Sequence, residues 1–407
     1  MALQDRLRDD SRAVHDEVVA LRHDLHRHPE VGLDLPVTQD LVLRALDGLP
    51  LEVTTGKALS SVTAVLRGKP GGPTVLLRGD MDALPVQEET GLDFSSQVDG
   101  TMHACGHDLH TAMLVGAAKV LSAQRDDLAG DVVFMFQPGE EGWDGAGVML
   151  EEGVLDASGR RADSAYGMHV MSAQIPAHVF TTRPDTLMAA SDAMYVTVHG
   201  TGGHGSMPHL ARDPITVAAE IITSLQTLVT RRFDIFDPVV VTVGSFHGGT
   251  KRNIIADSAR LEITVRSFSA VARERIKAEA PRLARDVAHA HGLEAEVDWH
   301  DEYPLTVNDA AHAAFAAEVA TDVFGDSGYQ HMQVPTPGAE DFSRVLDAVP
   351  GSYVFLGAHP GDSADTPNNH SPRAVFVDEV MADGVLLHAS LATRALERDA
   401  ARLEGAR

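Results

Sequence analysis

The chain has 407 residues and a formal net charge of −26, with 44 % hydrophobic and 23 % charged residues. These values are typical of a globular protein of about two or three domains and exclude a disordered or fibrous chain. The acidic excess argues against binding to nucleic acid or to anionic membrane surfaces, since both attract clustered Lys and Arg. No stretch of about 20 mainly apolar residues occurs, so we expect no membrane span.

The chain contains a single cysteine, Cys105. One cysteine excludes an intrachain disulfide and favours a reducing compartment. Residues 1–10 alternate charges and lack the apolar segment of a signal peptide. We therefore expect a cytoplasmic protein.

Helical spacing of apolar residues predicts a helix over residues 11–28, which Pro29 ends. Four short apolar runs then predict buried strands of a parallel or mixed sheet, at 74–77, 132–136, 165–168 and 353–356. Further helical stretches lie at 109–123, 145–152 and 385–407. This alternation is typical of an α/β domain.

The middle of the chain predicts a different domain. Residues 192–199 alternate as in a half-exposed strand, and a helix follows Asp213-Pro214 up to about Arg232. Next come predicted strands at 239–246 and 259–268, a helix at 270–291 and a strand at 293–299. This β-α-β-β-α-β order is ferredoxin-like. We predict a small domain at 190–300, inserted into a larger one formed by 1–189 and 301–407.

Residues able to bind metals or move protons gather in four clusters, at 78–82, 103–110, 137–142 and 167–169. Three of these clusters end predicted strands, where open α/β sheets form their sites. A late histidine, His370, could join them. The sequence therefore predicts one shared crevice.

The types of residue in these clusters suggest a metal site. Cys105 and His107 stand two apart on a turn, where one metal could reach both. Of the adjacent acids Glu140 and Glu141, which face opposite ways in extended backbone, one can bind a metal while the other acts as general base. Asp80 or Asp82 could orient a ligating histidine from behind, as is usual at metal sites. The alternative is a buried apolar cysteine beside an ordinary acidic loop.

A glycine-rich stretch, Gly-Thr-Gly-Gly-His-Gly at 200–205, matches the pattern of a dinucleotide-binding loop. In such a site the helix opens within the glycine motif, whereas here Pro208 and Asp213-Pro214 delay it. We interpret the stretch as a flexible loop that presents His204. Two alternatives to a hydrolase are a nicotinamide-dependent oxidoreductase using residues 200–205 and a catalytically inactive binding homologue.

Together the motifs resemble the aminoacylase–carboxypeptidase family of dinuclear metallopeptidases. The nearest branch is that of the amidohydrolases: hippurate hydrolases, N-acyl-L-amino-acid amidohydrolases and indoleacetyl-amino-acid hydrolases. The matching stretches follow in order over nearly the whole chain: LHRHPE (25–30), RGDMDALP (78–85), MHACGHDLH (102–110), FQPGEE (136–141), GMHV (167–170), GGHGSMPH (202–209), GAEDF (338–342) and NHSP (369–372).

This resemblance implies a mixed-sheet, zinc-peptidase-like catalytic domain with an inserted lid that also dimerises. It implies two divalent ions. The types of ligand suit Zn²⁺ and also admit Mn²⁺, Co²⁺ or Ni²⁺. Their implied ligands are Cys105, His107, Glu141, His169 and His370, with Cys105 bridging. Other branches have a ligating His at the position of Asp80 and a bridging Asp at that of Cys105, and His107 is expected to supply the missing ligand.

The resemblance also implies roles for the remaining site residues. Glu140 is the implied general base, and Asp82 orients a ligand from behind. His204 on the lid stabilises the oxyanion, often in the partner subunit's site. Asn253 lies near the substrate carboxylate, although Ala256 replaces the usual Pro in this motif. The implied reaction is hydrolysis of an N-acyl amino acid to a carboxylate and an amino acid by a homodimer.

Overall fold

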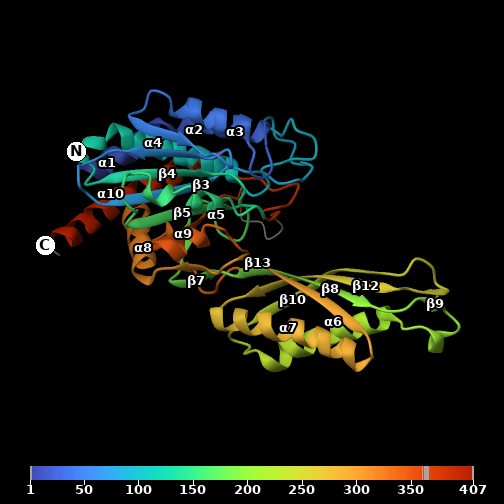
Figure 1. The fold of residues 1–407 in the computed structure, drawn as a ribbon. Coiled ribbons are helices and arrows are strands. Elements are labelled where there is room, and N and C mark those ends of the chain that lie inside the picture. Colours follow the sequence, from blue (N-terminus) through green and yellow to red (C-terminus); the bar gives the residue numbers. More distant parts are fainter. Residues whose placement is uncertain (1, 360, 362–365, 406–407) are drawn as a thin grey trace. The chain divides into compact units, whose positions relative to one another are not determined.

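The computed structural model describes residues 2–359, 361 and 366–405, which divide into two compact units (Figure 1). The first comprises the described residues up to Leu187, Val307–Val334 and those from Asp341 onward. The second comprises Met188–Thr306 and Pro335–Glu340. None of the helices in these described residues combines the length and apolar character that a bilayer crossing needs.

The first unit is built on an eight-stranded mixed sheet with the strand order β1-β2-β4-β3-β5-β16-β6-β15. Its strands are β1 (Leu51–Thr55), β2 (Val62–Leu66), β3 (Thr74–Asp80), β4 (Asp131–Gln137), β5 (Ser164–Met171), β6 (Phe180–Thr182), β15 (Tyr329–His331) and β16 (Gly351–Gly357). Neighbouring strands among β4, β3, β5 and β16 pair in parallel. The pairs β1–β2, β2–β4 and β16–β6 are antiparallel. The mixed α/β fold predicted from the sequence is confirmed.

Helices of the first unit cover both faces of this sheet. They are α1 (Leu3–Ala13), α2 (His15–Arg27), α3 (Pro36–Leu46), α4 (His107–Ala123), α5 (Gly145–Glu151), α8 (Ala310–Phe324), α9 (Ser343–Ala348) and α10 (Met381–Gly405), with short 3₁₀ turns at Arg125–Asp127, Val154–Asp156 and Asp378–Val380. Strands β4 and β5 lie on opposite sides of β3 in the sheet. The chain passes from β3 through α4 to β4, and then in the opposite direction from β4 through α5 to β5. Right-handed crossovers therefore place α4 and α5 on opposite faces.

Parallel strands bring their carboxyl ends to one edge of the sheet. Asp80 ends β3, Gln137 ends β4 just before Glu140 and Glu141, and His169 lies near the end of β5. Each of these strands is almost entirely buried, as their continuous apolar sequences predict. The fold therefore gathers three of the four predicted clusters at one edge.

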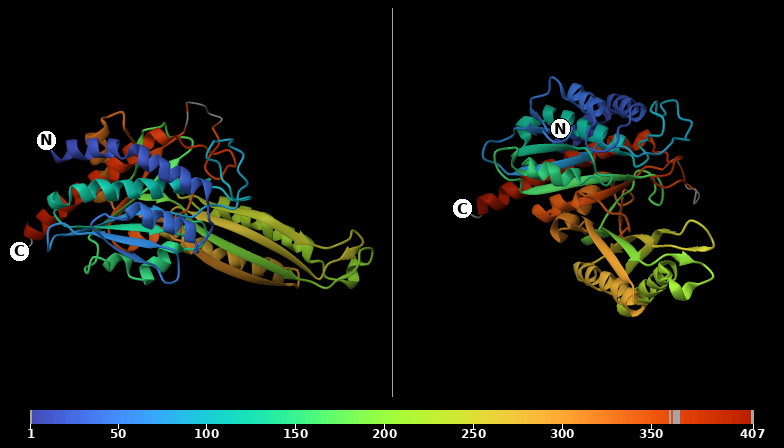
Figure 2. Two further views of the ribbon diagram at one scale, coloured as in Figure 1. Left: turned by 90° about the horizontal axis from the view of Figure 1, so that it is seen from above. Right: turned by 45° about the vertical axis from the view of Figure 1, so that its right-hand side comes forward.

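The second unit contains a four-stranded antiparallel sheet of order β10-β12-β8-β13. Its elements are β8 (Ala190–His199), β9 (Gly203–His204), a 3₁₀ turn (Pro208–Leu210), α6 (Pro214–Arg232), β10 (Val239–Gly248), β11 (Ile254–Ile255), β12 (Ser258–Ser267), α7 (Ala270–Ala290) and β13 (Glu294–Tyr303). In the views of this unit in Figures 1 and 2, α6 and α7 lie side by side along the sheet, and they pack against each other. A further small sheet pairs β7 (Asp185–Met188) with β14 (Thr306–Asn308).

Three predicted elements differ most from the observed ones. The region expected to form one helix, 11–28, belongs to two helices, because α1 ends at Ala13 and α2 begins at His15. The strand expected at 293–299 continues to Tyr303. The last helix begins at Met381 rather than at residue 385, and the predicted end at Arg407 lies outside the described residues.

Candidate metal centre and active site

The five residues predicted as metal ligands lie close together in the first unit. The Sγ atom of Cys105 lies 3.4 Å from Nε2 of His169, and Nε2 of His370 lies 3.1 Å from Oε1 of Glu141. Potential ligand atoms of Cys105, His107 and His169 all lie within 4.8 Å of one another, and so do those of Cys105, Glu141 and His370. Cys105 thus belongs to both groups.

A tight turn presents Cys105 to the cluster. Gly106 has a φ of +86°, and a Cβ atom there would lie 2.4 Å from a methyl group of Val170. Only glycine fits this conformation and this space without strain. Helix α4 begins at the next residue, His107, so the turn fixes the thiol and this imidazole relative to each other.

The segment that carries His370 lies against this turn. The backbone N–H of His370 donates to the carbonyl of Ala104 over 2.8 Å, and Nδ2 of Asn369 donates to the carbonyl of Cys105 over 3.2 Å. His370 has a φ of +70°, which is rare for a residue with a side chain and common at functional sites. These contacts fix His370 beside Cys105 despite their separation in the sequence.

Asp82 links the acidic pair to His107. Its two carboxylate oxygens accept hydrogen bonds from the backbone N–H groups of Glu140 and Glu141, each over 3.0 Å. Its backbone carbonyl lies 2.9 Å from Nδ1 of His107. Asp82 therefore fixes both acids and orients the imidazole from behind.

The acidic pair occupies a turn, which corrects the expectation of extended backbone. Gly139 and Gly142 flank the pair with φ values of +74° and +86°, and the N–H of Gly142 donates to the carbonyl of Glu140. Glu140 is 6 % exposed, and its carboxylate, with that of Glu141 and the imidazole of His107, forms another group of ligand atoms within 4.8 Å. Both acids thus face the same cluster.

Charges around the cluster compensate one another. Burial would raise the pKa of Asp80, but the charge of Arg78, followed by those of His107 and His110, holds it well below its usual value. Burial would lower the pKa of His107, but Asp80 and then Cys105 hold it well above. Hydrogen bonds to Cys105 and Glu141 raise the pKa of His370 to about 10. A cation could replace the protons of these histidines.

One buried atom of the cluster supports the binding of a metal ion there. Through Nδ1, His107 contacts Asp82, whereas its buried Nε2 makes no hydrogen bond among the described residues and has the carboxylate of Asp80 beside it at 3.5 Å. Buried polar atoms in native proteins nearly always have a partner, so such an atom needs an explanation. Imidazole, thiolate and carboxylate donors that face one another suit a transition metal.

His204 and Asn253 belong to the second unit, where they lie next to each other. β9 pairs with β11, so that His204 stands opposite Ile254, and the N–H of Gly205 donates to the carbonyl of Asn253 over 2.9 Å. Nδ1 of His204 accepts a hydrogen bond from the hydroxyl of Ser206. Both side chains are exposed. The structure thus brings these two residues together within this unit.

Two residues near the cluster were not predicted. Arg78 is fully buried and donates to Asp80 over 2.6 Å and to Asp341 over 3.1 Å. The only sign of Arg78 in the sequence is that a charged residue directly follows the apolar run at 74–77. Asn369 stands beside His370 in the NHSP stretch, and no local pattern shows that its amide contacts the turn at Cys105.

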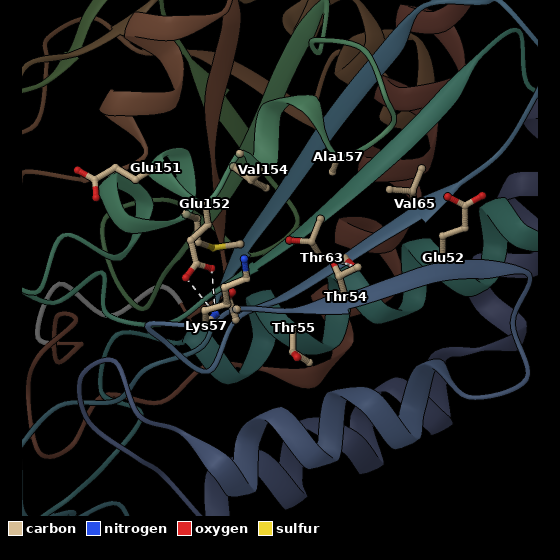
Figure 3. Close-up of a pocket in the computed structure, with 14 residues that line it drawn as sticks. Glu52, Thr54, Thr55, Lys57, Thr63, Val65, Glu151, Glu152, Val154 and Ala157 are labelled. Atoms are coloured by element: carbon tan, nitrogen blue, oxygen red, sulfur yellow. Dashed lines mark hydrogen bonds between the residues drawn. The ribbon is translucent and has the colours of Figure 1, made fainter.

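A hollow elsewhere in the first unit contains none of the predicted site residues. It lies over β1, β2 and the end of α5 (Figure 3). The carboxylate of Glu152 there accepts hydrogen bonds from the backbone N–H groups of Lys57 and Ala58. These contacts hold the loop at Lys57 and Ala58, and the hollow contains none of the ligand atoms gathered around Cys105.

The glycine-rich stretch at 200–205 does not open a helix. Gly203 and His204 form the short strand β9, and the next α-helix begins at Pro214. The N–H groups of that helix therefore do not meet the glycine motif, as a dinucleotide site requires. This geometry does not favour the oxidoreductase alternative.

The chain is similar to known proteins over most of its length. Residues 76–394 match peptidase family M20/M25/M40. The chain is 37 % identical to thermostable carboxypeptidase 1 of Saccharolobus solfataricus, covering 97 % of this chain and 99 % of the relative. It is 37 % identical to IAA-amino acid hydrolase ILR1-like 4 of Arabidopsis thaliana, covering 94 % and 86 %.

A solved structure is similar over almost the whole chain. The YXEP protein of Bacillus subtilis, described as a dinuclear metal-binding peptidase of the M20 family, is 33 % identical and has a TM-score of 0.81. The match covers 95 % of this chain and 99 % of the other. The chain therefore belongs to peptidase family M20/M25/M40, as its motifs indicated, and it is a hydrolase of amide bonds.

Proposed function

We propose that this enzyme hydrolyses N-acyl amino acids with the help of two divalent ions. Cys105, His107 and His169 would hold one ion, and Cys105, Glu141 and His370 the other. The observation that carries this proposal is that Cys105 belongs to both groups of ligand atoms. The buried Nε2 of His107, which makes no hydrogen bond among the described residues, supports it, and so does the dinuclear metal binding described for the B. subtilis relative.

The donor set favours particular ions. Thiolate and imidazole suit Zn²⁺, and the carboxylate also admits Mn²⁺, Co²⁺ or Ni²⁺. Bound here, such ions would lower the pKa of water toward neutrality and polarise the amide carbonyl.

Residues of the chain itself move the protons and hold the substrate. Glu140 takes a proton from the attacking water and returns it to the leaving amine, as a general base and then acid. Asp82 holds Glu140 in place through the backbone. His204 donates a hydrogen bond to the oxyanion, a contribution of about 3–4 kcal/mol for one such donor. Asn253 binds the carboxylate of the substrate.

The substrate class follows from the relatives together with the site. A carboxypeptidase and an IAA-amino acid hydrolase both, by name, split an amide bond to an amino acid. We propose the same leaving group here, with a hippurate-like or related acyl group. We further propose that the enzyme is cytoplasmic and forms a homodimer through the second unit.

Replacing Glu140 tests the proposed chemistry. The wild type, loaded with metal, should release free amino acid from at least one of acetyl, benzoyl and indoleacetyl amino acids. On the best of these substrates, Glu140→Gln should lower kcat by about 10²–10⁴-fold, the usual contribution of general acid–base catalysis. Its metal content, measured by elemental analysis, should stay near that of the wild type.

Two control variants define the result. Glu141→Gln should lose metal as well as turnover, whereas Glu151→Gln, on the exposed side of α5, should change neither. Turnover of Glu140→Gln within tenfold of the wild type would reject Glu140 as the base. A metal-replete wild type that hydrolyses none of these substrates would reject the proposed substrate class.

A further inference from the structure

A buried arginine of α2 contacts both segments that carry the ligand cluster. Arg22 is 1 % exposed, and its Nε donates to the carboxylate of Asp108 over 3.1 Å. Its Nη1 donates to the carbonyl of Phe376 over 3.0 Å and pairs with the carboxylate of Asp378. Asp108 follows His107 directly, and the other two partners follow His370 in the sequence.

These two segments also touch each other close to the ligands. The backbone N–H of His370 donates a hydrogen bond to the carbonyl of Ala104. The ring of Phe376 lies so near Gly106 that a Cβ atom added there would be 3.1 Å from it. The two segments thus contact each other directly at the turn that carries Ala104 and Gly106. The guanidinium of Arg22 joins them a second time. A planar guanidinium with several donors in fixed directions suits such a bridge better than an ammonium.

The charges around Arg22 are matched and enclosed. Asp108 is fully buried, and one of its oxygens also lies 2.9 Å from Nδ1 of His26. The ring of Phe94 lies 5.2 Å from the guanidinium carbon. The contacts of Arg22 therefore reach two segments, each of which carries a proposed ligand. Here one acid adjoins His107, of one ligand group, and the other contacts follow His370, of the second group.

We propose that Arg22 is a positioning residue for the dinuclear centre. By bridging the first turn of α4 and residues 376–378, it fixes His107 and His370 relative to Cys105, which both groups share. Removing it should weaken metal binding more than it weakens the fold. This role rests on the ligand set given under Proposed function.

Binding of Co²⁺ tests this role without reference to turnover. We expect Arg22→Met to bind Co²⁺ about 10–100-fold more weakly than the wild type, the usual effect of removing a residue that supports metal ligands. Thiolate–Co²⁺ absorption, measured against a competing chelator, reports the affinity. The rise in unfolding midpoint caused by saturating Co²⁺ should shrink accordingly. Arg22→Lys keeps the charge and should restore part of the affinity.

Arg398→Met provides the matched control. Arg398 also bridges buried groups of the first unit, contacting Tyr166 and Asp399, but it contacts neither of the two segments that Arg22 joins. It should lower the midpoint of the metal-free protein while leaving Co²⁺ affinity unchanged. If Arg22→Met does not fold, Arg22→Lys decides. It should bind Co²⁺ more weakly than the wild type, by less than the loss of about 10–100-fold expected for removing the residue.

The possible failures are distinct. Wild-type Co²⁺ affinity in Arg22→Met, or in Arg22→Lys where only that variant folds, would overturn the role of Arg22 and leave the ligand set standing. The same would follow if Arg398→Met lost as much affinity. A wild type that binds no Co²⁺ would reject the ligand set itself, and the role of Arg22 with it.

Discussion

His26 is a buried histidine of α2 that keeps its proton because carboxylates contact it. Its Nδ1 lies 2.9 Å from Asp108, and Nε2 lies 3.4 Å from Glu88. Burial would lower the pKa of His26, but the charge and hydrogen bond of Asp108, together with the hydrogen bond of Glu88, raise it to about 9. The folded protein therefore binds this proton more tightly than the unfolded chain does.

The stability of the protein should consequently fall in alkaline solution. The contribution of His26 is fully present below pH 6.5, its ordinary pKa, and is lost as the pH rises through about 9. At about 1.4 kcal/mol per pKa unit, the loss amounts to about 3 kcal/mol. The free energy of unfolding, measured by urea titration between pH 6 and pH 10, should show this decline.

Neighbouring groups do not change the sign of this effect. Glu88, with its pKa lowered to about 2, and Asp108, lowered further, stay ionised throughout this range. Burial lowers the pKa of His103 to about 3, so this residue stays neutral. In His26→Gln the decline should be smaller by about the same 3 kcal/mol. An identical pH profile for variant and wild type would contradict the assignment.

At the level of elements, the turn between the metal-binding motif and α4 depends on one glycine. Gly106→Ala would place a methyl group 2.4 Å from Val170 and force an alanine into a φ of +86°. The conformation costs about 1–2 kcal/mol and the overpacking another 1–3 kcal/mol. We expect a lower free energy of unfolding and, because Cys105 must shift, weaker metal binding.

Gly153→Ala is the matched control for this substitution. Gly153 has nearly the same φ, +88°, but an added Cβ would meet nothing within 4 Å. It should cost only about 1–2 kcal/mol for the backbone conformation and leave metal affinity unchanged. Equal losses in both variants would show that Val170 yields and that the turn tolerates a side chain.

The sequence predicted the elements whose signals are local. The buried strands β3, β4, β5 and β16 were recognisable as apolar runs bounded by turn residues. The ligands Cys105 and His107 were recognisable because they lie two residues apart in one motif. Such features depend on neighbours in the chain, so composition and spacing carry them.

Features that depend on distant contacts were missed. The turn at Glu140 and Glu141 follows from positive φ at the flanking glycines and from the bonds to Asp82, not from any alternation in the sequence. Likewise, no local pattern distinguishes Arg22 from the other polar residues of its helix, yet it is buried where Asp108 and Asp378 contact it. Only the fold brings those acids together.

For the whole molecule, the second unit has its own core and extends beyond the predicted range. Apolar side chains of its sheet pack with those of α6 and α7, separately from the core of the first unit. Besides Met188–Thr306, the unit includes Pro335–Glu340, where the carbonyl of Thr336 accepts from the N–H of Ala189. No local pattern could assign that short segment.

The surface of the second unit bears on the proposed homodimer. Leu210, Ile235 and Phe236 are 71 %, 80 % and 89 % exposed. Among these, Phe236 is held outward in a turn, where its N–H donates to Asp234. Burying such side chains against a second copy would remove apolar area from water, which favours association. Sedimentation should therefore show a dimer, and Phe236→Asp together with Ile235→Asp should shift it toward monomer.

Mixing two inactive variants tests whether His204 acts in the partner's site. If it does, a hybrid of His204→Ala and Glu140→Gln chains has one site with both native residues, although neither chain is active alone. Random exchange makes half of the dimers hybrids, so about a quarter of wild-type activity should return. If His204 acts in its own subunit, each hybrid site lacks one residue and no activity returns. Exchange must be verified with tagged chains, because activity that stays absent in verified hybrids would exclude donation across the dimer.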